Sequence, residues 1–174
     1  MSAFKQTEIY SLAGEVGKWL SQHEYKLVTI ESCTGGGIAQ AITSIAGSSG
    51  WFDRGLVTYT NQAKHDMAGV PLKLIHDHGA VSIEVAKAMA IGGLNNSEAD
   101  IGVSVTGIAG PDGGSASKPV GTVCFAWALK SIGETTISDS QNHVFKGDRE
   151  QVRARSVAHA LQTILTLKEP LIKT

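Results

Sequence analysis

The stretch that decides how this chain folds is Val28-Thr29-Ile30-Glu31-Ser32-Cys33-Thr34-Gly35-Gly36-Gly37. A β-branched run ends at an acidic residue, and a hydroxyl and a thiol then precede three glycines. This order is typical of a strand, a tight turn and the start of a helix. Open α/β sheets bind ligands where their strands end, and the first turn of a helix favours anions. The sequence therefore predicts the functional site at this turn.

Helical and extended patterns alternate on both sides of the turn. The expected elements are a helix over residues 6–22, a strand over 27–30, a helix from Ile38 that ends at Gly47, a loop over 48–55, a strand over 56–60, a short helix from Pro71 to His78 with Gly79 as its left-handed stop, a helix after Ser82, a strand over 101–105, a hairpin of 120–129 with 135–145, and a last helix capped by Asp148 and Gln151. This alternation predicts one domain over residues 1–174. Its fold class is α/β, with three α/β/α layers in which helices flank a small, mostly parallel or mixed sheet.

Length and charge restrict the possible partners. The chain has 174 residues, a length typical of one domain, and a formal net charge of −1. A nearly neutral chain provides no general field for nucleic acid or an anionic membrane, and no window holds the run of about 20 apolar residues that spans a bilayer. Cys33 and Cys124 form neither a metal-binding spacing nor a disulfide framework. We therefore expect a cytoplasmic protein with reduced thiols, a small-molecule ligand, and neither nucleic acid nor membrane as a partner.

Three loops that follow strands carry the candidate chemistry: residues 32–37, 59–64 and 106–114. If the first two strands run parallel, as a right-handed crossover favours, their loops meet at one edge of the sheet. Ser32, Tyr59 and Lys64 then lie close together. The sequence predicts a ligand site there, whereas a single glycine loop could equally be structural.

Ser32 is the candidate nucleophile, and a serine hydroxyl needs a base within hydrogen-bonding reach. None of the six histidines falls in the three loops. Lys64 can be the base if burial and nearby positive dipoles lower its pKa, but a solvated lysine at a helix start is the alternative. Tyr59 either relays a proton or is a half-buried strand aromatic.

Other polar residues near these loops have two interpretations each. Cys33 is a second nucleophile candidate, but a thiolate usually needs a histidine or a cation beside it. Glu31 either binds a ligand hydroxyl or orders the turn, and the second is the simpler role. Arg149 opens the last helix and suits a phosphate, unless it is merely solvated.

Several motifs in this order resemble the CinA C-terminal domain family. They are Glu31-Ser32-Cys33-Thr34-Gly35-Gly36, Ile45-Ala46-Gly47-Ser48-Ser49, Val57-Thr58-Tyr59, Asn61 with Ala63-Lys64, Thr106-Gly107-Ile108-Ala109-Gly110-Pro111-Asp112-Gly113-Gly114, and Lys118-Pro119-Val120-Gly121-Thr122-Val123. The resemblance covers residues 8–166, nearly the whole chain.

The resemblance implies an enzyme of pyridine-nucleotide salvage. Such an enzyme hydrolyses the carboxamide of nicotinamide mononucleotide to nicotinate mononucleotide and ammonia, with no metal or cofactor, through a Ser/Lys dyad assisted by tyrosine. On this chain the catalytic residues would be Ser32, Lys64 and Tyr59. Ser48 lies in another matching motif and is the alternative nucleophile, although helix capping is its simpler role.

The expected substrate contacts come from all three loops and from the last helix. They are Glu31, Thr34, Gly35, Gly36, Asn61, Thr106, Gly107 and Arg149. Backbone N–H groups of the 34–36 turn or of the Gly107 loop would stabilise an oxyanion. Related proteins suggest a homodimer, and the aromatic pair Trp51 and Phe52 in a loop hints at a buried contact.

Two other functions remain open at this point. A non-catalytic module that senses pyridine nucleotides would use the same glycine loops but would need neither Ser32 nor Lys64. A cysteine amidase would instead depend on Cys33.

Overall fold

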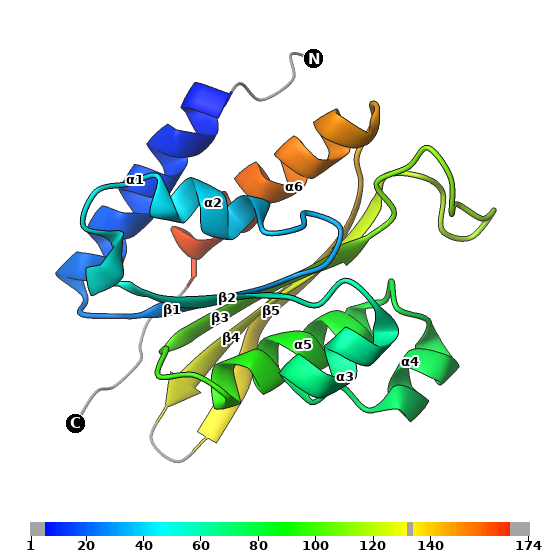
Figure 1. Ribbon diagram of the computed structural model, residues 1–174, viewed down its shortest axis with the longest axis horizontal. Helices are drawn as coiled ribbons and strands as arrows, with labels where there is room; N and C mark the ends of the chain where they lie inside the picture. The colour runs from blue at the N-terminus through cyan, green and yellow to red at the C-terminus, as the bar shows by residue number, and fades with distance from the viewer. Residues whose placement is uncertain (1–5, 132–133, 168–174) are drawn as a thin grey trace.

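A five-stranded sheet with helices on both faces forms the computed structural model, which describes residues 6–131 and 134–167 (Figure 1). The elements in chain order are α1 (Gln6–Gln22), β1 (Leu27–Glu31), α2 (Gly37–Thr43), the 3-10 helix η1 (Ser48–Gly50), β2 (Phe52–Val57), α3 (Asn61–Ala68), α4 (Leu72–His78), α5 (Ile83–Asn95), β3 (Ile101–Gly107), β4 (Thr122–Ser131), β5 (Glu134–Val144) and α6 (Arg149–Ile164). The predicted α/β/α architecture is confirmed.

The strand order of the sheet is β2-β1-β3-β4-β5. β1 runs parallel to both β2 and β3, whereas β3, β4 and β5 are successively antiparallel. The sheet is therefore mixed. Because β1, β2 and β3 share one direction, the chain segments that follow them leave the sheet at the same edge, where open sheets bind ligands.

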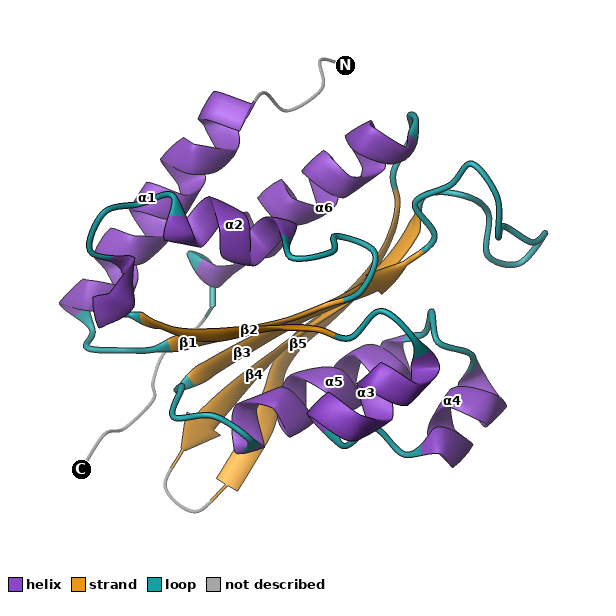
Figure 2. Cartoon of the chain, in the orientation of Figure 1, coloured by secondary structure: helices purple, strands orange, loops and turns teal. Residues whose placement is uncertain are grey.

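Helices cover the sheet on two sides, and each side has its own apolar core. α1, α2 and α6 cover one face, and α3, α4 and α5 cover the other (Figure 2). Every residue of β1 is buried, because this strand is sandwiched between both helical layers. The turn that carries Ser32 thus follows a strand that is buried along its whole length.

Side-chain caps begin two of the helices as predicted. Asp148 accepts a hydrogen bond from the N–H of Gln151, and the Gln151 side chain accepts one from the N–H of Asp148, which completes a capping box at α6. The Ser82 hydroxyl accepts from the N–H of Val85 at the start of α5. None of the helices in the described part of the chain has the length and apolarity needed to cross a bilayer.

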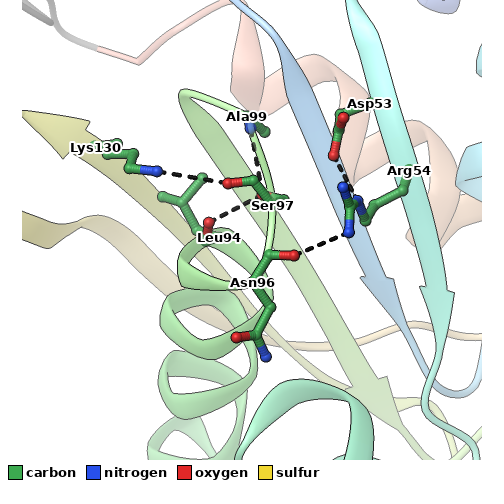
Figure 3. Close-up of polar contacts among 7 residues, drawn as sticks. All are labelled: Asp53, Arg54, Leu94, Asn96, Ser97, Ala99 and Lys130. Carbon is green, nitrogen blue, oxygen red and sulfur yellow. Dashed lines mark hydrogen bonds and ion pairs between the residues drawn. The ribbon is translucent and has the colours of Figure 1, made fainter.

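Two basic side chains from the sheet hold the C-terminal end of α5 (Figure 3). Arg54 of β2 donates to the carbonyl of Asn96 at 3.0 Å and pairs with Asp53, while Lys130 of β4 donates to the carbonyl of Ser97 at 3.5 Å. Cations complement the partial negative charge at a helix C-terminus. These contacts fix α5 at the sheet edge opposite the carboxyl end of β1.

Two predicted elements have clearly different boundaries, and one predicted conformation is wrong. β2 spans Phe52–Val57 rather than residues 56–60, because its exposed edge carries polar residues and a glycine that hide the strand pattern. α2 ends at Thr43, before Gly47. Gly79 ends α4 with φ 78° and ψ 153°, so it is not in the left-handed helical region. The predicted hairpin of β4 and β5 is confirmed, but residues 132 and 133 and the two ends of the predicted 1–174 domain lie outside the described residues.

Trp51 packs inside its own chain. Its side chain is 5% exposed and belongs to the core under α1, with Phe52 partly buried against the same core. The Trp51 ring lies so close to α1 that a Cβ added at Gly17 would approach it to 2.5 Å. The interpretation of this aromatic pair as a sign of a subunit contact is therefore wrong.

Candidate active site

A serine hydroxyl and a lysine amine meet at the carboxyl end of β1. Lys64 Nζ lies 3.1 Å from Ser32 Oγ and 2.9 Å from the carbonyl oxygen of Thr58. Both side chains are buried, with Ser32 7% and Lys64 1% exposed. The predicted juxtaposition of these two residues is present.

The parallel pairing of β1 with β2 brings them together. The pairing continues past the end of β2, where the N–H of Thr58 donates to the carbonyl of Glu31 at 2.8 Å. Thr60 then caps α3 by accepting from the N–H of Ala63, which places Lys64 in the first turn of that helix. On the other side of β1, the N–H of Ser32 donates to the carbonyl of Val105 of β3 at 2.9 Å. Neighbouring strands thus hold both ends of the Ser32–Lys64 contact.

Burial lowers the pKa of Lys64 below its ordinary value, because desolvation disfavours the charged ammonium. Its two hydrogen-bond partners are a hydroxyl and a carbonyl, neither of which carries the negative charge that would stabilise an ammonium. A neutral amine can donate to Thr58 and accept the proton of Ser32. Lys64 therefore has the environment that a lysine base needs.

Cys33 has the opposite environment from that of a reactive thiol. Burial is the main cause that raises its pKa to about 12, and the nearby Glu31 adds to the effect. Because the thiolate is the nucleophilic form, a thiol with this pKa is a poor nucleophile at neutral pH. The cysteine-amidase alternative loses its chemical basis.

A cavity of about 190 Å³ opens over the Ser32–Lys64 pair. Seven of the predicted site residues line it, namely Ser32, Tyr59, Asn61, Lys64, Thr106, Gly107 and Arg149. Cys33 and three apolar residues, Ala80, Val81 and Ala109, complete the wall. No histidine is among these lining residues. In the part of the chain that the structure describes, no group of three or more His, Cys, Asp or Glu side chains is placed to hold a metal ion.

Tyr59 and Arg149 stand together at the rim of this cavity. Tyr59 is 58% exposed, so the half-buried strand position considered from the sequence is wrong. Arg149 Nη2 donates to the Tyr59 hydroxyl at 3.2 Å, and Nη1 donates to the carbonyl of Gly110 at 2.8 Å. The guanidinium thus links the segment after β2 with the loop after β3, at the N-terminus of α6.

The carboxylate of Glu31 forms hydrogen bonds with the turn after Ser32 and with the start of α2. Its carboxylate accepts hydrogen bonds from the Thr34 hydroxyl at 2.7 Å and from the N–H groups of Ile38 and Ala39 at 3.0 and 2.9 Å. Glu31 is buried and does not line the cavity. This corrects the expectation of a substrate contact, since the carboxylate instead orders the turn and starts α2.

Fewer residues of the turn after Ser32 line the cavity than predicted. Thr34, Gly35 and Gly36 do not line it, and the N–H of Gly35 donates to the carbonyl of Ser32 at 3.0 Å. Gly35 and Gly36 have φ values of 59° and 91°, which glycine adopts without strain. In this geometry these three residues shape the turn and do not contact a ligand in the Ser32 cavity.

Ser48 lies at the other end of the sheet from Ser32. It belongs to η1, and Trp51, which directly follows η1, accepts a hydrogen bond from the N–H of Leu27 at the start of β1. Ser48 does not line the Ser32 cavity. Within one chain it is therefore not placed to react with the help of Lys64.

Two contacts of the site carry little signal in the sequence. The carbonyl of Thr58 receives the Lys64 amine, and a backbone acceptor has no side-chain signature. Arg153 of α6 donates to the carbonyl of Thr34 at 2.9 Å. The spacing of four residues between Arg149 and Arg153 places both on one face of α6, which is the one sequence feature that points to the second arginine.

Comparison with known proteins agrees with the motifs. A family model described as CinA C-terminal domain matches residues 9–168. The chain is 50% identical over 160 residues to the nicotinamide-nucleotide amidohydrolase PncC of Enterobacter agglomerans, an overlap of 92% of this chain and 95% of that protein. It is also 50% identical over 158 residues to the protein of the same name from Escherichia coli K12, with 91% and 93% covered.

Among solved structures, competence/damage inducible protein CihA from Agrobacterium tumefaciens is similar, with a TM-score of 0.87 at 42% identity, and the match covers 97% of this chain and 100% of that one. The chain belongs to the CinA C-terminal domain family.

Proposed function

We propose that this protein hydrolyses the carboxamide of nicotinamide mononucleotide to nicotinate mononucleotide and ammonia, with Ser32 as nucleophile and Lys64 as base. The observation that carries the proposal is the 3.1 Å distance between Lys64 Nζ and Ser32 Oγ, two groups that line the same cavity. The names of the two amidohydrolase relatives supply the substrate class. The reaction would serve cytoplasmic salvage of pyridine nucleotides.

The first half of the reaction forms an ester at Ser32. Neutral Lys64 takes the hydroxyl proton as Ser32 Oγ bonds to the amide carbon, and the amide oxygen becomes an oxyanion. The resulting ammonium of Lys64 then gives its proton to the amide nitrogen, the carbon–nitrogen bond breaks and ammonia leaves. Lys64 is neutral again, and the nicotinoyl group is bound to Ser32.

The second half consumes one water molecule. Lys64 takes a proton from the water as its oxygen attacks the ester carbon, and the proton returns to Ser32 as the ester bond breaks. Nicotinate mononucleotide leaves and both residues regain their starting states. One amide and one water thus give one acid and one ammonia.

Backbone N–H groups beside Ser32 are the candidates for stabilising the oxyanion. The N–H of Gly35 is already used by the Ser32 carbonyl, and Thr34 does not line the cavity, which leaves the N–H of Cys33 as the nearest candidate in the turn. One such donor typically contributes about 3–4 kcal/mol to transition-state stabilisation.

The rim of the cavity suits the rest of the nucleotide. Arg149 is exposed there at the N-terminus of α6, and a guanidinium next to helix N–H groups favours a phosphate. Tyr59, Asn61 and Thr106 offer hydrogen-bonding groups for the ribose. We also propose that the protein is a homodimer, which light scattering during size-exclusion chromatography would test.

Ammonia release from nicotinamide mononucleotide tests the proposal directly. The wild type should release ammonia and nicotinate mononucleotide in equal amounts, and Ser32→Ala should release neither. Ser48→Ala is the matched control and should keep the wild-type rate. Activity in Ser32→Ala combined with its loss in Ser48→Ala would exclude Ser32 as the nucleophile.

The same experiment separates the enzyme from a sensing module. A module would be stabilised thermally by nicotinamide mononucleotide but would release no ammonia, and its stabilisation would survive Ser32→Ala. Comparing the mononucleotide with the riboside and the dinucleotide would then define the preferred substrate.

A further inference from the structure

Arg153 reaches from α6 to the backbone of the turn that carries Ser32. Its Nη2 donates to the carbonyl of Thr34 at 2.9 Å, across 119 residues of sequence, and the same carbonyl accepts from the N–H of Gly37 at 3.1 Å. Nη2 also lies 3.6 Å from the place where a Cβ of Gly35 would stand. The guanidinium therefore packs directly on the peptide between Thr34 and Gly35. Figure 2 shows α2 and α6 side by side on the same face of the sheet.

The guanidinium lies behind the turn and outside the Ser32 cavity. Arg153 is absent from the lining of that cavity. It lines a second cavity of about 220 Å³, together with Thr34, Gly37 and Gln40. A ligand held at Ser32 would therefore touch the front of the turn, and Arg153 would touch the back.

The position of Arg153 is not optimal for its own hydrogen bonding. Its Nε is buried and has no hydrogen-bond partner among the described residues. A buried N–H without an acceptor is unfavourable. The side chain thus keeps its contact with the Thr34 carbonyl at a cost to one of its other donors, which is a pattern expected where geometry serves function.

Two charged side chains, Glu31 and Arg153, hold different groups of the turn. Glu31 binds the Thr34 hydroxyl and the first N–H groups of α2, and Arg153 binds the Thr34 carbonyl. Ser32 lies between Glu31 and Thr34 in sequence, so its hydroxyl can stay 3.1 Å from Lys64 only while this turn stays in place. The positive charge of Arg153 also reaches the neighbouring Cys33, where it opposes the rise of the thiol pKa.

We propose that Arg153 is a positioning residue that holds the Ser32 turn in its reactive geometry without contacting the substrate. This inference rests on the proposed function. Misplacement of a reacting group by about 1 Å can lower a rate by about 100-fold. Loss of Arg153 should therefore reduce kcat, whereas KM should change little.

Steady-state kinetics on three variants test the proposal. Arg153→Met should lower kcat for nicotinamide mononucleotide by about 100-fold while KM stays within about twofold of the wild type. Arg153→Lys keeps the positive charge and a hydrogen-bond donor, so its kcat should lie between that of the wild type and that of Arg153→Met. Arg155→Met is the matched control on the same helix, because Arg155 donates to the carbonyl of Lys146, away from the turn. Its kcat should equal that of the wild type.

A second readout does not depend on the substrate. The rate at which a fluorophosphonate reagent labels Ser32 reports the reactivity of the hydroxyl itself, and Arg153→Met should slow it as it slows kcat. If the wild type releases no ammonia, the proposed function fails, and the labelling rates still decide the role of Arg153.

Several results would overturn the proposal. The first is an Arg153→Met variant whose kcat and labelling rate equal those of the wild type. The second is an Arg153→Met variant with a raised KM and an unchanged kcat. The third is a loss of kcat in Arg155→Met as large as that in Arg153→Met. Thermal unfolding of each variant identifies a misfolded protein. If Arg153→Met does not fold, an unchanged kcat and labelling rate in folded Arg153→Lys would refute the role, and a reduced kcat at unchanged KM would support it.

Discussion

Lys64 Nζ lies 3.1 Å from Ser32 Oγ, although one residue follows β1 and the other belongs to α3. The contact exists because β1 and β2 run parallel, so the segments after them emerge at the same edge of the sheet. Both groups are buried, and the lysine forms its hydrogen bonds with the Ser32 hydroxyl and the Thr58 carbonyl rather than with a carboxylate. This pair supports the acid–base chemistry proposed for the site, and substituting each side chain separately tests that chemistry.

Replacing Lys64 by Met should abolish most turnover and leave the fold intact. Removal of a general base typically lowers a rate by about 10²–10⁴-fold. The apolar side chain avoids the desolvation that the buried amine suffers but leaves the Thr58 carbonyl without its donor, so these two contributions oppose each other and thermal stability should change little. Ammonia release and the thermal midpoint measure the two effects. Lys73→Met, at an exposed position on α4, is the control and should retain activity. Near-normal ammonia release from Lys64→Met would remove the lysine base.

The activity should depend on the protonation state of Lys64. Its pKa lies below the ordinary 10.5 because burial disfavours the ammonium. In the proposed mechanism the neutral amine is the active form, so kcat/KM should rise with pH and level off above the lowered pKa, at a pH below 10.5. A pH profile of kcat/KM measures this limb. A rate that stays flat, or that falls as the lysine deprotonates, would contradict the assignment of Lys64 as base.

Cys33→Ala should retain turnover, in contrast to Ser32→Ala. Burial raises the pKa of the Cys33 thiol to about 12, so almost no thiolate is present at neutral pH. Brief treatment of the wild type with iodoacetamide should likewise leave the rate unchanged. Ammonia release after either change is the measurement. Complete loss of activity in folded Cys33→Ala would reinstate a cysteine mechanism.

The Ser32–Lys64 contact could be predicted from sequence because it follows from topology. A strand, a crossover helix and a parallel strand bring the two loops to one edge whatever the detailed packing. The start of β2 could not be predicted in the same way. Asp53, Arg54 and Gly55 lie on an edge strand, where exposure permits polar residues that break the apolar alternation.

The roles of charged residues were harder to predict than their positions. Glu31 follows a buried strand, where a carboxylate can face either a ligand or the start of the next helix, and only the geometry shows that both its oxygens face α2. The contact between Arg153 and Thr34 spans 119 residues and uses a backbone carbonyl. Such contacts leave no periodic pattern. The sequence therefore predicted that Ser32 and Lys64 lie together, but not which residues hold the turn around them in place.

Glu31→Gln should destabilise the fold. The amide of glutamine keeps one acceptor oxygen but replaces the other with an NH₂ group. This NH₂ group would face donors from which the carboxylate oxygen now accepts, so a buried hydrogen bond is lost. Leaving a buried donor unsatisfied costs about 1–3 kcal/mol of the free energy of unfolding. Urea denaturation measures this change, with Glu98→Gln as an exposed control. Unchanged stability in Glu31→Gln would show that the carboxylate does not organise the start of α2.

Acid should destabilise the protein in part through His159. This side chain of α6 lies against His143 of β5, with ring centroids 4.2 Å apart, and both Nε2 atoms point at the Oε1 of Gln141 at 2.9 and 3.0 Å. The Gln141 amide is oriented by its own donation to Asp139 at 2.6 Å, so its oxygen faces the two rings. Each ring must therefore donate from Nε2.

The direction of the pH effect follows from the pKa of His159. Burial, followed by the neighbouring His143, lowers this pKa from 6.5 to about 4. Between these pH values the unfolded chain binds a proton that the folded His159 does not, so the free energy of unfolding falls as pH falls from 6.5 towards 4. His159→Gln keeps a donor for Gln141 but cannot titrate, and its stability should fall less steeply over this window. Urea denaturation at several pH values gives both slopes. Equal slopes in the two proteins would mean that His159 titrates alike in the folded and unfolded chains, because only a difference in proton binding between the two states makes stability depend on pH.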